Sequence, residues 1–291
     1  MERLRIVSMN IEGGGIDKKG DDSKLQAAIR FLGKAAADVV LVQEAKWSGE
    51  NASRLERTAK LLGMMGNIAI ANGTGQTGCH LATFHQPDTL DLTSFTQRGA
   101  PFWHARSSAK FAPKEQPGVE FRVLNRHGPP FDPVQRLQEA HYDVGLADYP
   151  NTVIGGDFNC IPPGDPELVW DGWRDWQPPK LREIEYQALK DGTTGEFILD
   201  ENDMLQADRR PAIVMERNGL LDVGAQFNDR RPTAGSDGSK SGPRRLDRFH
   251  ATRSLFEREA IVGYGLLGDP DEASQFTDHS PIYVDIDPRK L

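Results

Sequence analysis

Short apolar runs that each lead to a polar side chain recur along this chain. Asn10 follows one such run, Glu44 follows a second, and Asp157 follows a third, two residues before Asn159. Apolar runs of four to eight residues bounded by turn signals are typical of buried strands. The pattern therefore predicts a sheet protein in which several strands bring a carboxylate or an amide to one place.

Strand-like runs alternate with amphipathic segments in the first part of the chain, which favours a mixed α/β fold. The pair Asp132-Pro133 indicates a helix start, because Asp caps a helix and Pro suits its first position. We expect strands at 4–10, 38–44, 67–72, 80–85, 102–107, 119–125, 152–157, 247–252, 261–264 and 281–286, and helices at 24–36, 51–62, 132–149 and 211–217.

Length and composition predict one soluble domain. The chain has 291 residues, no internal repeat and no linker, so we expect a single catalytic domain over residues 1–291. No apolar stretch approaches the roughly 20 residues of a membrane span. The N-terminus enters a strand at once without a secretory signal, so we expect a cytoplasmic monomer. Two cysteines, Cys79 and Cys160, provide no disulfide framework.

The net charge of −8 argues against a large nucleic-acid interface, which usually needs a basic face. A metal-dependent nuclease can nevertheless carry clustered carboxylates that a cation neutralises. The charge therefore shifts weight toward smaller phosphate substrates and leaves a nucleic-acid substrate open.

Carboxylate, amide and imidazole groups at strand ends are the groups that metal-assisted hydrolysis of a phosphate ester requires. Glu44 is the expected main ligand of Mg²⁺, for which Mn²⁺ can substitute, because it ends an otherwise apolar strand. Asn10 can ligate or orient the same ion through its amide oxygen. The alternatives are a surface carboxylate for Glu44 and a turn-forming role for Asn10.

Five motifs in order resemble the endonuclease/exonuclease/phosphatase superfamily, and they extend over nearly the whole chain. They are Asn10, Gln43-Glu44, Gly156-Asp157-Phe158-Asn159, Leu246-Asp247-Arg248 and Thr277-Asp278-His279. The resemblance implies a four-layer sandwich of two mixed β-sheets with flanking helices, which the alternation of elements alone does not predict.

The resemblance also implies roles for the motif residues. Asp157 would orient or deprotonate the attacking water, and Asn159 would hold a phosphate oxygen. His279 would contact the scissile phosphate as an acid–base catalyst or as an imidazolium ion. Asp247 would accept its other ring N–H, and Asp278 would lie on the metal side. Without the other motifs, Gly-Gly-Asp-Phe-Asn would simply indicate a turn.

His127 resembles the second catalytic or phosphate-binding histidine of the family. The run Val123-Leu124-Asn125-Arg126-His127 resembles the family strand that ends in this histidine. The family usually places a branched aliphatic residue next, whereas Gly128 follows here.

Two segments are candidates for substrate binding. Trp170 and Trp173, with Trp176, repeat at a spacing of three and could stack on a base, a sugar or a lipid, or could instead cap a subsidiary core. Arg244 and Arg245 end a Gly/Ser-rich segment beside Asp247 and could grip a phosphate, or could belong to a solvated loop.

These observations predict a Mg²⁺-dependent phosphodiester hydrolase, with a nuclease as the leading interpretation. The alternative is a phosphatase or phosphodiesterase of a small-molecule or lipid phosphate, which the acidic balance and the tryptophans favour. A non-catalytic binding protein on the same scaffold is a third hypothesis, which no residue supports because each expected catalytic position carries a competent side chain.

Overall fold

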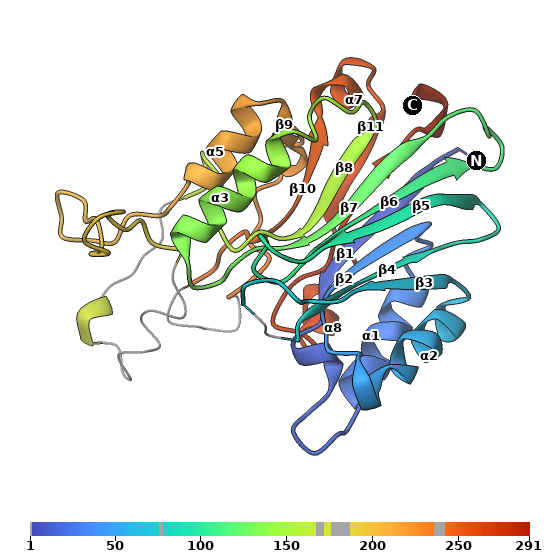
Figure 1. Ribbon diagram of the computed structural model, residues 1–291, viewed down its shortest axis with the longest axis horizontal. Coiled ribbons are helices and arrows are strands. Elements are labelled where there is room, and N and C mark those ends of the chain that lie inside the picture. The colour runs from blue at the N-terminus through green and yellow to red at the C-terminus, as the bar shows by residue number, and fades with distance from the viewer. Residues whose placement is uncertain (1, 76–77, 167–171, 176–186, 236–241) are drawn as a thin grey trace.

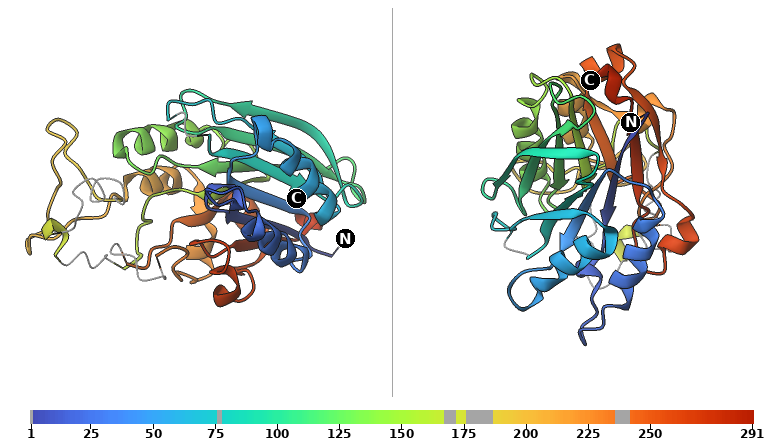
Figure 2. Two further views of the ribbon diagram at one scale, coloured as in Figure 1. Left: turned by 90° about the horizontal axis from the view of Figure 1, so that it is seen from below. Right: turned by 90° about the vertical axis from the view of Figure 1, so that its right-hand side faces the viewer.

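The computed structural model describes residues 2–75, 78–166, 172–175, 187–235 and 242–291. Two six-stranded mixed sheets form the centre of the molecule, and helices lie on their outer faces (Figure 1). The predicted four-layer α/β sandwich is therefore confirmed. Figure 2 shows the two sheets from two further directions, with the N- and C-termini at the same end of the molecule.

The first sheet has the order β11-β12-β1-β2-β4-β3 and the second has the order β5-β6-β7-β8-β10-β9. The parallel neighbours are β1 with β2 and β7 with β8, so the carboxyl ends of each pair lie at one edge of its sheet. The strands of the first sheet are β1 (Leu4–Asn10), β2 (Val39–Ala45), β3 (Met65–Ala69), β4 (His80–His85), β11 (Ile261–Leu266) and β12 (Ile282–Ile286). Those of the second are β5 (Leu90–Arg98), β6 (Arg106–Pro113), β7 (Phe121–His127), β8 (Thr152–Asp157), β9 (Leu220–Asp222) and β10 (Asp247–Thr252).

Helices cover both outer faces. Helices α1 and α2 lie on the first sheet, and α3 and α5 pack together on the second (Figure 1). The helices are α1 (Ser23–Gly33), α2 (Ser53–Leu62), α3 (Pro133–Val144), α5 (Arg210–Arg217), α6 (Val223–Gln226), α7 (Arg253–Glu257) and α8 (Pro270–Ala273). Short 3₁₀ turns are η1 (Gly13–Gly15), η2 (Gly49–Asn51), η3 (Trp173–Asp175) and η4 (Pro288–Lys290).

The apolar core occupies the space between the sheets. Ile6 and Leu41 from the first sheet meet Val123, Val153 and Phe249 from the second, and all are almost fully buried. Alternate residues on the same strands point outward into two further clusters beneath the helices. A strand that is buried on both faces reads as a continuous apolar run, which is why the central strands were predictable.

Several predicted boundaries are confirmed, and others differ: β3 and β7 are shifted by about two residues from the predicted 67–72 and 119–125, and α3 ends at Val144 where 149 was predicted. Strands β4, β8 and β10 have the predicted limits, and Asp132 accepts hydrogen bonds from the N–H groups of Val134 and Gln135 at the start of α3. The predicted strand at 102–107 has the wrong limits, because β6 starts only at Arg106. Strand β5 was not predicted. The outer face of β5 is polar and exposed, so it lacks the apolar signal of a buried strand.

Candidate active site

Strand pairing in the second sheet places three of the predicted site residues in one row. Asp157 ends β8, and its direct neighbours are His127 on β7 and Asp247 on β10. Side chains of directly paired residues lie on the same face of a sheet. The row therefore combines one imidazole and two carboxylates at one edge of the second sheet.

The glycine before Asp157 permits this close pairing. Gly156 has φ of 149°, and a Cβ atom at this position would lie 1.8 Å from the carbonyl oxygen of Arg126. No real side chain tolerates such a distance, so only glycine lets β7 and β8 approach here. Gly128 has a similar role, because a Cβ atom there would lie 2.5 Å from the carbonyl oxygen of Phe158. This contact explains why a glycine replaces the aliphatic residue expected after His127.

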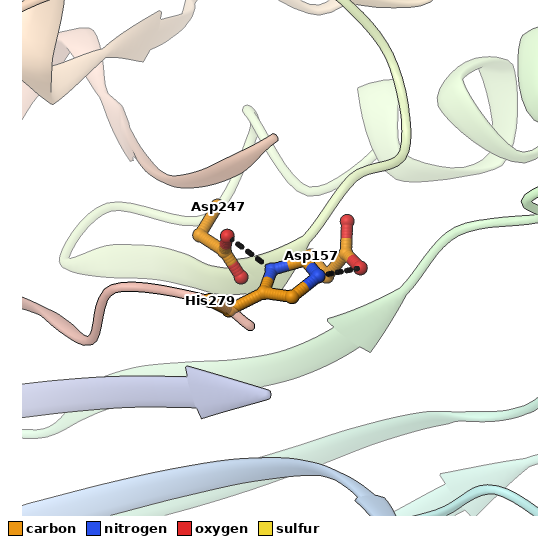
Figure 3. A group of neighbouring side chains, drawn as sticks. All are labelled: Asp157, Asp247 and His279. Atoms are coloured by element: carbon orange, nitrogen blue, oxygen red, sulfur yellow. Dashed lines mark hydrogen bonds and ion pairs between the residues drawn. The ribbon is translucent and has the colours of Figure 1, made fainter. Parts of the chain in front are cut away.

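His279 lies between two carboxylates (Figure 3). Its Nδ1 is 2.6 Å from Oδ2 of Asp247, and its Nε2 is 3.9 Å from Oδ2 of Asp157. His127 lies near the same Asp157 oxygen, with its Nε2 at 3.6 Å. Each of Asp157, Asp247 and His279 places a ligand atom within 4.8 Å of the others. The three side chains therefore form one compact acidic and histidine cluster.

Two side chains from the first sheet complete this cluster. Nδ2 of Asn10 donates to Oδ2 of Asp157 at 3.2 Å and to Oε1 of Glu44 at 3.3 Å. Glu44 also accepts a hydrogen bond of 2.8 Å from the backbone N–H of Gly13. The ends of β1 and β2 are thus joined to the end of β8 across the sandwich, as the strand-end pattern predicts.

Glu44 reaches the cluster through an unusual backbone conformation. Its φ is 58°, and the pairing of β2 with β4 shifts register between Val42 and Ala45. A left-handed non-glycine residue costs free energy of about 1–3 kcal/mol and is concentrated at functional sites. The bulge turns the Glu44 side chain toward Asn10, where regular alternation would not place it.

Burial and neighbouring charges set the protonation of the cluster. Burial opposes the charged form of His279, but Asp247 and then Asp157 outweigh it and raise the pKa of His279 to about 10. Burial acts against ionised Asp157 as well, yet His279 and His127 hold its pKa below the usual value. Burial raises the pKa of Asp247, although His279 opposes that shift. At neutral pH the cluster therefore contains a carboxylate at Asp157 beside an imidazolium at His279.

Asn159 and Asp278 lie around this centre in different ways. Strand β8 ends at Asp157, and Asn159 has φ of 50°, so strand alternation does not place Asn159 near Asp157. Instead, its backbone N–H donates to Oδ1 of Asp157 at 2.9 Å, and its Nδ2 donates to the carbonyl of Gly128. Asp278 has a side chain that is 52% exposed, with Oδ1 4.0 Å from Nε2 of His279. Asp278 thus lies at the solvent side of the site.

The predicted substrate-binding role of Arg245 is wrong, because its guanidinium is buried and fully engaged. It forms hydrogen bonds with both oxygens of Asp165 and both oxygens of Asp222, at 2.7–3.0 Å. The side chain is 1% exposed and ties the segment after β8 to the start of α6. Arg245 therefore stabilises the framework behind the site and has no donor directed at a substrate.

The other residues predicted to bind substrate lie in different surroundings. The backbone of Arg244 pairs with Ala234, which also pairs with His279, and the Arg244 side chain donates to Gln187 at 2.8 Å. Trp173 packs edge-on against Phe197 at 5.5 Å in a small apolar cluster outside the main sandwich, which matches the subsidiary-core alternative. Trp170 and Trp176 lie outside the described residues.

Replacing Arg245 with alanine is expected to lower the free energy of unfolding by about 3–5 kcal/mol, because two buried carboxylates lose their partner. Arg231→Ala is the matched control: its pair with Asp229 is half-exposed and should contribute at most about 1 kcal/mol. Urea denaturation measures the free energy of unfolding of both variants. Equal, small losses in the two variants would contradict the assignment of Arg245 to the framework.

Two threonines that the motifs did not single out as site residues hold the site together. Oγ1 of Thr277 donates to the carbonyl of Asn10 at 2.7 Å and accepts the N–H of His279. Oγ1 of Thr233 accepts the N–H groups of Leu246 and Asp247. Thr277 stands inside a recognised motif, but nothing in the Gly/Ser-rich sequence around Thr233 indicates its role. His104, which stands in no motif, stacks its ring on that of His127 at 4.0 Å.

A cavity of about 530 Å³ opens beside His279. Glu12, Asp271 and Asp278 contribute carboxylates to its wall, and Lys24 contributes an ammonium group. This volume lies within the usual range of small-molecule sites, about 300–1,000 Å³. The cluster around His279 thus borders a cavity of the size of a small-molecule site.

Comparison with known proteins identifies the family and the fold. The model of the endonuclease/exonuclease/phosphatase family matches residues 7–279. A family protein from Bacteroides vulgatus is similar in structure, with a TM-score of 0.65, 14% identity, and coverage of 98% of this chain and 99% of that one. No curated protein matches in sequence.

Two further solved structures are similar over nearly their full lengths. The endonuclease domain of TRAS1, a telomere-specific non-LTR retrotransposon, has a TM-score of 0.57 and 14% identity, with 98% of each chain covered. A mannosyl-6-phosphatase from Bacteroides thetaiotaomicron has a TM-score of 0.60 and 15% identity, with 97% of this chain and 98% of that chain covered. At these identities, the likeness shows a shared fold.

The fold and the family match thus place the chain in a class of proteins whose members are phosphate-ester hydrolases. The chain belongs to the endonuclease/exonuclease/phosphatase family. Within the part of the chain that the structure describes, no helix is long and apolar enough to cross a membrane.

Proposed function

We propose that this protein is a Mg²⁺-dependent phosphodiesterase that cleaves nucleic acid. The observation that carries the proposal is the convergence of Asn10, Glu44, Asp157 and His279 from the ends of both sheets into one hydrogen-bonded cluster. Hydrolysis of a phosphodiester requires neutralised charge, an oriented water and a stabilised leaving oxygen. The cluster contains a candidate for each requirement.

The donor set fits a hard divalent cation. The carboxylates of Glu44 and Asp157 lie close enough to share the single amide group of Asn10. His127, Gly13 and Asn10 outweigh burial and lower the pKa of Glu44, so the group is ionised at neutral pH. Glu44 would be the main ligand, with Asn10 and Asp278 near the ion or its waters. Bound there, Mg²⁺ would supply charge neutralisation of the phosphate and stabilisation of the leaving oxygen.

The protein's own groups would position the other reactants. Asp157 accepts a proton of the attacking water and orients it toward phosphorus. His279 donates its Nε2–H to an oxygen of the scissile phosphate, while Asp247 holds the opposite ring nitrogen and fixes the orientation of the ring. Asn159 and His127 hold the remaining phosphate oxygens from the side of β7.

A phosphatase of a small phosphorylated molecule is the second candidate function. The cavity of about 530 Å³ beside His279 favours it, as does the net charge of −8. The structural neighbours include both an endonuclease domain and a sugar phosphatase, so the fold supports either substrate class.

A metal-dependent hydrolysis screen tests the proposal. Plasmid DNA, single-stranded DNA, RNA, inositol phosphates and mannose 6-phosphate are incubated with the protein, with and without Mg²⁺. We expect cleavage of at least one nucleic acid that EDTA abolishes and the Asp157→Ala variant lacks. Turnover of only the inositol phosphates or mannose 6-phosphate would select the second candidate function. Turnover that does not depend on the metal would contradict both candidates.

A further inference from the structure

A groove of about 350 Å³ lies on the outer face of the second sheet, over β5, β6 and β7. The catalytic cluster uses the inner faces and ends of the strands. On β7, inward-facing Asn125 donates to carbonyls of the first sheet, whereas Leu124 packs on the helix side. Helices α3 and α5 lie on this side of the sheet (Figure 1), and Tyr142 near the end of α3, with Tyr149 beyond it, forms one wall of the groove. The groove is therefore separate from the catalytic site.

Strand register gathers cations in this groove. Arg98 on β5 lies directly opposite Arg106 on β6, and Lys110 on β6 lies directly opposite Arg122 on β7. All four residues line the groove, whose described lining contains no carboxylate. Like charges directly opposite each other destabilise a sheet. An anion bound between the members of each pair would relieve this repulsion.

These cations are only partly neutralised by the protein. Arg106 pairs with Asp143 at 2.8 Å, and Lys110 lies 3.8 Å from Glu120, where both side chains are exposed. The Arg122 guanidinium stacks on the ring of Tyr149 at 4.1 Å, and its buried Nε has no hydrogen-bond partner among the described residues. Arg98 is exposed and forms no ion pair with the described part of the chain. The groove therefore keeps a positive excess.

We propose that this groove is a second phosphate-binding site, which takes a small ligand with two linked phosphate groups. A guanidinium can form two parallel hydrogen bonds to a phosphate, and Lys110 adds a compact charge. The hydroxyl of Ser108, between the two cationic rows, adds a neutral donor. The volume is near the lower limit for a small-molecule site, which suits a diphosphate better than a polymer.

The ring of Tyr149 gives this ligand a further point of recognition. The Arg122 guanidinium already stacks on one face of this ring, and Tyr149 lines the groove. An aromatic group attached to the diphosphate, as in a nucleoside diphosphate, could contact the exposed edge of this residue. This inference concerns a face that the proposed catalysis does not use, and it stands whether or not the protein cleaves nucleic acid.

Calorimetric titration with inorganic pyrophosphate in EDTA tests the site, since EDTA removes any contribution of a catalytic metal. The doubly substituted variant Arg98→Gln/Lys110→Gln removes one cation from each cross-strand pair. Both side chains are accessible to solvent, so the substitutions should leave the fold intact. We expect its dissociation constant for pyrophosphate to rise at least tenfold. The Arg122→Gln variant should also have a higher dissociation constant for pyrophosphate than the wild type.

The control variant is Arg30→Gln/Lys60→Gln, which removes two exposed cations from α1 and α2 and changes the net charge equally. It should bind pyrophosphate as the wild type does. Equal affinities of the groove variant and the wild type would overturn the proposal. Binding of a 12-nucleotide single strand that depends on the groove, without groove-dependent binding of pyrophosphate, would also overturn it and point to a polynucleotide surface.

Discussion

Asp157→Asn is expected to lower turnover at least about 100-fold and to leave the fold intact, because the side chain is assigned to the attacking water. The asparagine keeps the shape of the side chain and can still accept the N–H of Asn159. It removes the negative charge that stabilises the His279 imidazolium and the oxygen that accepts a proton. Steady-state rates with the best substrate of the screen measure the loss.

Asp285→Asn is a suitable control for this prediction. Asp285 is also a buried carboxylate, and it pairs with Arg5 at 2.8 Å near the start of β1, at the opposite end of that strand from Asn10. This variant should lower the melting temperature without reducing turnover. Unchanged turnover in Asp157→Asn at an unchanged melting temperature would remove Asp157 from the mechanism.

Glu44→Gln is expected to raise the Mg²⁺ concentration for half-maximal activity at least about tenfold. The substitution preserves the size of the side chain and its bond to the Gly13 N–H, but it removes the charge assigned to the cation. Changes to outer-shell partners alone cost about 10–100-fold in metal affinity, so loss of the main ligand should cost no less.

Glu12→Gln is the matched control for the metal site. Glu12 is a nearby carboxylate whose side chain is 48% exposed and pairs with Lys24. It should leave the Mg²⁺ dependence of the rate unchanged. Direct titration with Mn²⁺ in the absence of substrate measures metal affinity alone. It therefore separates a loss of metal binding from a loss of catalytic rate. Equal metal affinity in Glu44→Gln and wild type would reassign the ligand.

The central architecture and the placement of the candidate site residues at strand ends were predictable because a buried strand has a simple signature. Asn10, Glu44 and Asp157 each follow an apolar run, and parallel strands bring their carboxyl ends to one edge. The cross-strand alignment of Asp157 with His127 and Asp247 follows from register, which short motifs imply but do not specify. The resemblance to a known family supplied the face-to-face arrangement of the two sheets.

What could not be predicted depends on contacts between distant parts of the chain. Arg245 looked available for a phosphate because its partners Asp165 and Asp222 are 80 and 23 residues away. The bulge that directs Glu44 requires pairing with β4, and no local residue indicates it. Strand β5 has a polar outer face, so it lacks the periodicity of a core strand, yet that same polarity forms the cationic groove.

The central claim is that the converging strand ends form a divalent-cation site for phosphate-ester hydrolysis. The most direct test is an anomalous difference map from a crystal of the protein soaked in Mn²⁺. We predict a peak within about 2.0–2.4 Å of a Glu44 carboxylate oxygen, with Asn10 or Asp278 near the ion or its waters. A fully soaked crystal with no peak at Glu44, in a protein that still hydrolyses its substrate, would contradict the claim.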